Sequence, residues 1–198
     1  CFGVATLRKV RDPRELLLGT LPLLFAAHQA LEGINWLALE GHVSHEVGKW
    51  SIYLYLVFAQ ALLPAISPWC FWLEEPDPKR RRLLIPLLVI GSCLCAFVLW
   101  KLSIDNTVAT NRGHDIAYDD SISANWWFGV LYIVATCTPP FLSSYPWMIA
   151  FALLNVAGLI FTLLFEAVFV ISLWGLLTGL VSIPIYLHFK RKRSLDLR

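Results

Sequence analysis

The residues best suited to chemistry in this sequence are a histidine and a glutamate set in apolar surroundings. His28 and Glu32 are four residues apart, so in a helix they lie one turn apart on the same face. An imidazole and a carboxylate at this spacing are typical of a metal-ligand pair or of a proton relay. Gln29 lies beside His28, and Asn35 follows Glu32 by three residues. The polar stripe therefore extends over about two turns.

This stripe is open to three functional interpretations besides a hydrogen-bonded pair that only fastens two helices. The first, which we favour, is a small binding, sensor or accessory membrane subunit with a polar pocket that faces the external side. The second is a metal-dependent membrane hydrolase that uses His28 and Glu32 as ligand and acid or base. The third is a small proton-coupled transporter in which Glu32 carries the proton.

Five further residues are candidates of other kinds. An external N-terminal cysteine, Cys1, has a free amine beside its thiol and could act as a ligand, a nucleophile or a lipid-modified residue. His42 and His45 have a spacing that can hold a metal, although a solvated loop is the simpler interpretation. His114 and Glu166 lie in external positions from which they could reach a ligand near Glu32.

The elements that position these residues are apolar runs of about twenty residues, the length needed to cross a bilayer as a helix. The composition agrees, with 58% hydrophobic and 15% charged residues and a mean hydropathy of +0.64. We expect an all-α, polytopic transmembrane bundle that forms one domain over residues 1–198. Its helices are expected over approximately 15–39, 50–73, 83–102, 124–142, 146–165 and 167–189.

Charge alternates between the loops that join these helices. Lysine and arginine gather before the first, before the third and after the last expected helix, whereas the loops around Glu40 and Asp115 are acidic or histidine-rich. Basic loops of multi-pass proteins stay in the cytoplasm. We therefore expect a multi-pass protein of the plasma (inner) membrane with a cytoplasmic C-terminus. The basic run after the last helix is expected to touch anionic lipid.

Two short regions modify this plan. The external segment 104–120 contains two β-prone stretches around Asn111-Arg112-Gly113, which predicts a short hairpin. The residues from Gly3 to Leu7 read as the last turn of an apolar helix that arrives at the basic loop. We expect a seventh, N-terminal helix with Cys1 at its external end, and a missing stretch between Phe2 and Gly3.

The sequence also resembles a known family over nearly its whole length. The phrase from Leu23 to Leu37, LLFAAHQALEGINWL, is similar to the second helix of an uncharacterised family of small bacterial seven-helix membrane proteins that begin Met-Cys-Phe-Ser. The segments 113–118, 139–144 and 172–174 are similar as well. The resemblance implies a seven-helix fold with an external N-terminus, and it implies no activity.

Several ligands and partners are not indicated by the sequence. No lysine lies in the middle of an expected span, so a retinal Schiff base has no anchor. Neither a haem-attachment motif nor a glycine-rich phosphate loop is present, and nothing indicates nucleic-acid binding. A divalent metal stays open as a cofactor. Membrane lipids are expected partners, and the sequence leaves a homo-oligomer or a larger membrane complex open.

Overall fold

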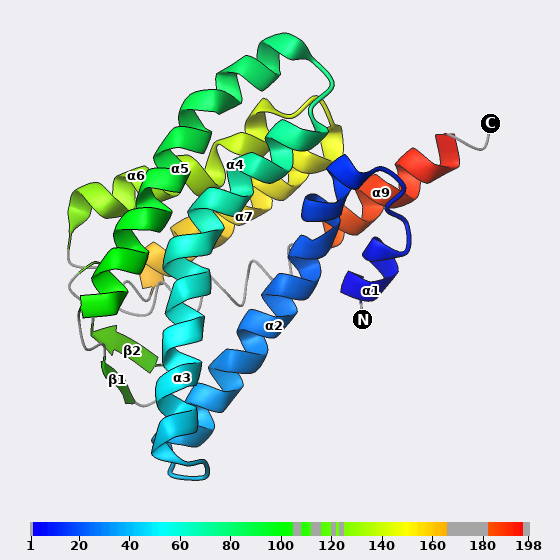
Figure 1. Ribbon diagram of the computed structural model, residues 1–198. Helices are drawn as coiled ribbons and strands as arrows, with labels where there is room; N and C mark the ends of the chain where they lie inside the picture. Colours follow the sequence, from blue (N-terminus) through cyan, green and yellow to red (C-terminus); the bar gives the residue numbers. More distant parts are fainter. Residues whose placement is uncertain are drawn as a thin grey trace.

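The computed structural model describes residues 2–104, 108–111, 116–119, 122, 125–165 and 182–195, and it is an all-α bundle with one small hairpin (Figure 1). The chain begins with α1 (Phe2–Leu7), a 3-10 turn η1 (Pro13–Glu15) and α2 (Leu16–Leu39). Residues 167–181 of the last expected helix, 167–189, lie outside the described residues, as do Cys1, His114 and Glu166.

The second long helical rod consists of three consecutive elements, α3 (His45–Leu56), a π-helical segment η2 (Val57–Leu62) and α4 (Leu63–Glu74). It begins five residues before the range expected from the sequence, because the Ser44 side chain accepts from the backbone N–H of Val47 at 3.4 Å and caps the first turn. Before it, Gly41 has a φ of +78°. His42 N–H donates to the Leu37 carbonyl there at 2.8 Å, which closes α2 with a Schellman-type turn.

The third rod, α5 (Pro78–Ile104), also begins earlier than expected. Asp77 accepts from the backbone N–H of Lys79 at 2.9 Å, and Pro78 suits the first helical position. The basic residues Lys79 to Arg82 consequently form the first turn of α5 and do not form a loop before it. The strands β1 (Val108–Asn111) and β2 (Ile116–Asp119) then pair antiparallel, Val108 with Asp119, so the expected hairpin is present.

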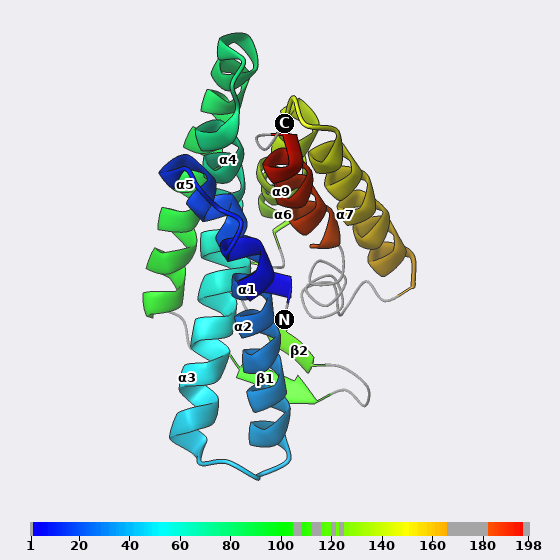
Figure 2. The same cartoon turned by 90° about the vertical axis from the view of Figure 1, so that its right-hand side faces the viewer.

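The remaining elements are α6 (Trp126–Cys137), a 3-10 turn η3 (Pro139–Leu142), α7 (Pro146–Phe165) and α9 (Ile183–Leu195). Prolines at 139 and 140 end α6, because neither residue can donate a backbone hydrogen bond. The turn between α2 and α3 and the hairpin lie at one end of the bundle, and the turn between α4 and α5 lies at the other (Figures 1 and 2).

The helices bury one face and expose another that is just as apolar. One core cluster joins α2, α4, α5, α7 and α9 through residues such as Phe25, Phe71 and Phe189. On the outer face of α5, Leu83, Ile85, Val89, Leu99 and Ile104 are exposed. Apolar side chains exposed along a whole helix indicate contact with lipid.

Three described helical rods are long and apolar enough to cross a membrane, at Pro13–Leu39, His45–Glu74 and Pro78–Ile104. Two shorter apolar helices, Trp126–Leu142 and Pro146–Phe161, accompany them. The all-α expectation is therefore confirmed, and the lengths and composition of these rods indicate a membrane protein.

Candidate functional site

The buried face of α2 changes from apolar to polar halfway along the helix. Leu21 and Phe25 belong to the core, and the same face continues with His28, Glu32 and Asn35, which are 4%, 7% and 0% exposed. His28 lies roughly 18 Å along the axis from Leu16, at a rise of about 1.5 Å per residue. The two side chains singled out in the sequence thus lie in the interior of the bundle, near the middle of a candidate span.

His28 is enclosed by aromatic rings of the neighbouring rod. Its imidazole stacks on Tyr55 with ring centroids 4.0 Å apart and an interplanar angle of 17°. Phe58 closes the other side at 5.0 Å. The His28 Nε2 atom is buried and has no hydrogen-bond partner within the described part of the chain. A buried polar atom of this kind is uncommon in proteins and calls for an explanation.

The rod opposite His28 carries the π-helical segment. Pro64 has no N–H, and its ring would clash with the carbonyl group four residues earlier in a regular α-helix. The wider turn η2 relieves this, and the Leu63 N–H donates to the Phe58 carbonyl five residues back. The Tyr132 hydroxyl of α6 donates to the Ala59 carbonyl at 2.6 Å. Single π-helical turns inside α-helices often occur at functional sites, and here the turn lies next to Tyr55 and Phe58.

Of the other described candidates from the sequence, Gln29, His42 and His45 lie apart from this buried face. Gln29 is half-buried, on a neighbouring part of α2. His42 and His45 are exposed at the turn between α2 and α3, where the His42 Nε2 atom lies 3.4 Å from the Glu40 carboxylate. Within the described residues, no three histidine, cysteine, aspartate or glutamate side chains lie close enough to hold a metal ion.

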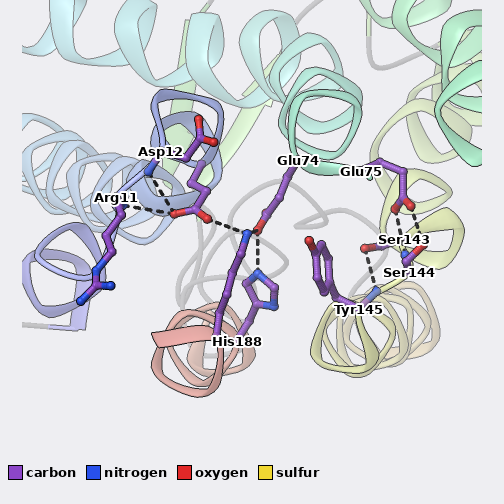
Figure 3. Close-up of polar contacts among 10 residues, drawn as sticks. Arg11, Asp12, Glu74, Glu75, Ser143, Ser144, Tyr145 and His188 are labelled. Atoms are coloured by element: carbon purple, nitrogen blue, oxygen red, sulfur yellow. Dashed lines mark hydrogen bonds and ion pairs between the residues drawn. The ribbon is translucent and has the colours of Figure 1, made fainter. Parts of the chain in front are cut away.

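A second cluster, which the sequence analysis missed, lies at the opposite end of α2. The His188 Nε2 atom of α9 is 2.7 Å from the Glu74 carboxylate at the end of α4. Lys192, one turn further along α9, reaches Glu15 at 2.5 Å and Glu74 at 3.3 Å. Figure 3 shows Glu74 and His188 pointing toward one another. We call Glu15, Glu74, His188 and Lys192 the ionic cluster. It joins η1, α4 and α9.

The charges of the ionic cluster support one another. Burial alone would lower the pKa of Lys192, but the contact with Glu15 and the charge of Glu74 outweigh it and raise that pKa. The Tyr145 ring packs against His188 at 4.5 Å and lies below the Lys192 ammonium at 5.3 Å. Burial raises the pKa of Tyr145, although Lys192 opposes this. Lys192 and Tyr145 therefore keep their ordinary protonated forms at neutral pH, and the cluster holds helix ends together.

Glu75, beside this cluster, fastens a second pair of turns. Its carboxylate accepts from the Ser144 backbone N–H at 2.8 Å and from the Ser144 hydroxyl. Arg80 of α5 donates to the Ser143 carbonyl at 3.0 Å. The turn between α4 and α5 is thereby tied to the turn before α7 (Figure 3). The adjacent acidic pair Glu74-Glu75 at the end of an apolar run was the signal in the sequence that could have indicated these contacts.

Together these features define an all-α protein with several helices of membrane-spanning length, a polar stripe in its interior and an ionic cluster at one end. The chain belongs to the family described as "Family of unknown function (DUF6629)", whose model matches residues 1–198. No curated protein and no solved structure matches the chain. The expectation that the chain belongs to an uncharacterised family is confirmed.

Proposed function

We propose that this protein is a multi-pass membrane protein that acts as a small binding, sensor or accessory subunit, with a polar ligand held around His28 and Glu32. The observation that carries the proposal is the buried His28 Nε2 atom, which lacks a hydrogen-bond partner within the described residues. A buried polar atom without a partner costs about 1–3 kcal/mol. A bound polar ligand that pairs with this nitrogen would remove that cost.

The surroundings of His28 support a ligand site over a simple fastening contact. The ring is fixed between Tyr55 and Phe58, so its free nitrogen has a set direction. Glu32 adds a buried carboxylate on the same face one turn away. Ionisable side chains in membrane spans are costly and commonly mark ligand or ion sites. We call the end of the bundle where η1, the start of α5 and α9 carry lysines and arginines the basic end. Because α2 leads away from it, we propose that the pocket opens at the other end, beside the hairpin.

The proposed orientation follows from the basic end of the bundle. Arginines and lysines at η1, at the start of α5 and along α9 would lie on the cytoplasmic side of a bacterial inner membrane, with the turn after Glu40 on the external side.

Native mass spectrometry of the protein released from membrane nanodiscs tests the ligand site. We expect the wild-type protein to carry an added small-molecule mass, which disappears in His28→Phe. That substitution keeps an aromatic ring against Tyr55 but removes the nitrogen. His42→Phe is the matched control, because His42 is exposed at the turn after α2, and it should retain the mass.

Glu32→Gln distinguishes binding from a structural contact, because it keeps the shape and removes the charge. For a ligand site we expect loss of the added mass in a protein that is still folded. A wild-type protein without any added mass, or a Glu32→Gln protein that differs only by a modest shift in thermal stability, would leave the pair as a fastening contact.

A further inference from the structure

The charged residues at the basic end of the bundle are sorted by sign between the interior and the surface. Three of its acidic residues, Glu15, Glu74 and Glu75, are buried, with 7%, 8% and 4% of the whole residue exposed. Two belong to the ionic cluster, and Glu75 is bonded to Ser144. These carboxylates therefore point inward and are engaged by partners within the protein, so the charged side chains that face outward at this end are mainly basic.

The positive charges face outward. The exposed basic residues at this end belong to η1 with the segment before it, to the start of α5 and to α9. We call them the basic surface, and they are Arg8, Arg11, Arg14, Lys79, Arg80, Arg82, Lys190 and Arg191. Among the described carboxylates near them, Asp12 is exposed and Asp77 is half-buried at 3.8 Å from Arg80. The net charge of the basic surface is thus much more positive than the net charge of the whole chain, which is +2.

Beside the basic surface, the half-buried residues Arg81 and Lys9 contact aromatic rings, and these contacts support a position of this end at the height of lipid headgroups. The Arg81 guanidinium lies 3.9 Å from the centre of the Trp72 ring, and the Lys9 ammonium lies 5.4 Å from the centre of the Tyr186 ring. Trp and Tyr are enriched where the hydrocarbon meets the headgroups. The candidate spans Pro13–Leu39 and Pro78–Ile104 begin at this end, so in a membrane the basic side chains would lie at the level of the lipid phosphates.

We propose that the basic surface binds anionic lipid headgroups in preference to zwitterionic ones. The complementary charge is the phosphate and the additional negative charge of the anionic lipid in the surrounding membrane. The inward-facing carboxylates favour this preference, because on the surface they would form ion pairs with the basic side chains and compete with the lipid phosphates. The ionic cluster thus contributes to lipid recognition indirectly, by removing Glu15 and Glu74 from the surface.

Lipid retention measured by native mass spectrometry tests the proposal. Full-length protein is reconstituted in nanodiscs that contain equal amounts of phosphatidylglycerol and phosphatidylcholine. We expect the retained lipids to be enriched severalfold in phosphatidylglycerol, and the enrichment to fall as salt is raised. In the double variant R11Q/R14Q the enrichment should fall at least threefold.

The matched control removes the same number of charges at the other end of the bundle. Lys49 of α3 and Lys101 of α5 are lysines of the described residues there, and K49Q/K101Q should leave the enrichment unchanged. Equal thermal stability of the two variants shows that both are folded. The proposal is overturned if wild type retains both lipids equally, if the control variant loses the same enrichment, or if free glycerol phosphate displaces the lipid, which would indicate a soluble anion as the ligand.

Discussion

Lys192 is the residue on which the ionic cluster depends, because its ammonium contacts two carboxylates from different elements. The side chains of Glu15 and Glu74 are only 9% and 3% exposed. Removing a charge that compensates buried carboxylates is more costly than losing an exposed ion pair. Lys192 is itself one-third exposed, so water reduces the loss.

We therefore expect Lys192→Met to lower the free energy of unfolding by about 2 kcal/mol, since it leaves both carboxylates without their cation. Lys192→Arg should recover most of this loss. The measurement is chemical unfolding in detergent micelles. Lys190→Met is the control, because Lys190 is exposed on the same helix, and its effect should stay within about 0.5 kcal/mol. Equal losses for the two methionine variants would contradict this role of Lys192.

The pH dependence of this contribution follows from the raised pKa of Lys192. A base whose pKa is higher in the folded state stabilises the fold fully below its ordinary value and loses this contribution as the pH rises through the folded value. The difference in unfolding free energy between wild type and Lys192→Met should stay constant from about pH 8 to about pH 10. A difference that falls within this window would show that the lysine loses its proton early.

At the scale of elements, the approach of α5 to α4 depends on a glycine. A Cβ atom on Gly91 would lie 2.0 Å from the Pro64 carbonyl oxygen and 3.2 Å from the Cα of Ala65. These are backbone atoms just after the π-helical segment, and they cannot move like the end of a flexible side chain. Gly91 therefore sets the distance between α5 and the rod that contains α4.

Gly91→Ala should destabilise the protein by about 3 kcal/mol, because it forces α4 and α5 apart. Gly129→Ala on α6 is the matched control, since nothing lies within 4 Å of the Cβ it would add. This control should be neutral or slightly stabilising, because alanine is the better helix former. Thermal unfolding of the two variants in the same detergent measures the difference. A well-tolerated Gly91→Ala would mean that the two helices pack less closely.

At the scale of the whole molecule, the two ends of the bundle differ in charge. The turn between α4 and α5, which is next to the basic start of α5, lies at one end, and the turn between α2 and α3 and the hairpin lie at the other (Figures 1 and 2). A membrane protein with this distribution is expected to keep its basic end in the cytoplasm. This orientation is needed for the proposed pocket near Glu32 to open to the outside.

Cysteine labelling in intact cells tests the orientation. In a background without the native cysteines, His42→Cys should react with a membrane-impermeant maleimide, and Arg82→Cys should react only after the cells are permeabilised. Both positions are exposed, so accessibility within the fold is matched. Labelling of both positions from the same side would rule out the proposed topology.

The sequence by itself determined that the chain forms apolar helices of membrane-spanning length, because apolar runs and their breakers act over a few neighbouring residues. It likewise determined the hairpin, where β-prone stretches flank a turn. The i, i+4 spacing of His28 and Glu32 was enough to place both on one face of α2. Only the tertiary structure decided what that face meets, the rings of Tyr55 and Phe58.

The ionic cluster shows why the rest required the fold. Glu74 and His188 are 114 residues apart in the chain, and Glu15 and Lys192 lie near its opposite ends. In the sequence, Glu15 and Glu74 resemble ordinary loop carboxylates at the ends of apolar runs. Their burial depends on how η1, α4 and α9 pack, which no local pattern encodes. For the same reason the sequence gives the number of charges at the basic end, whereas packing decides that the carboxylates point inward and the arginines outward.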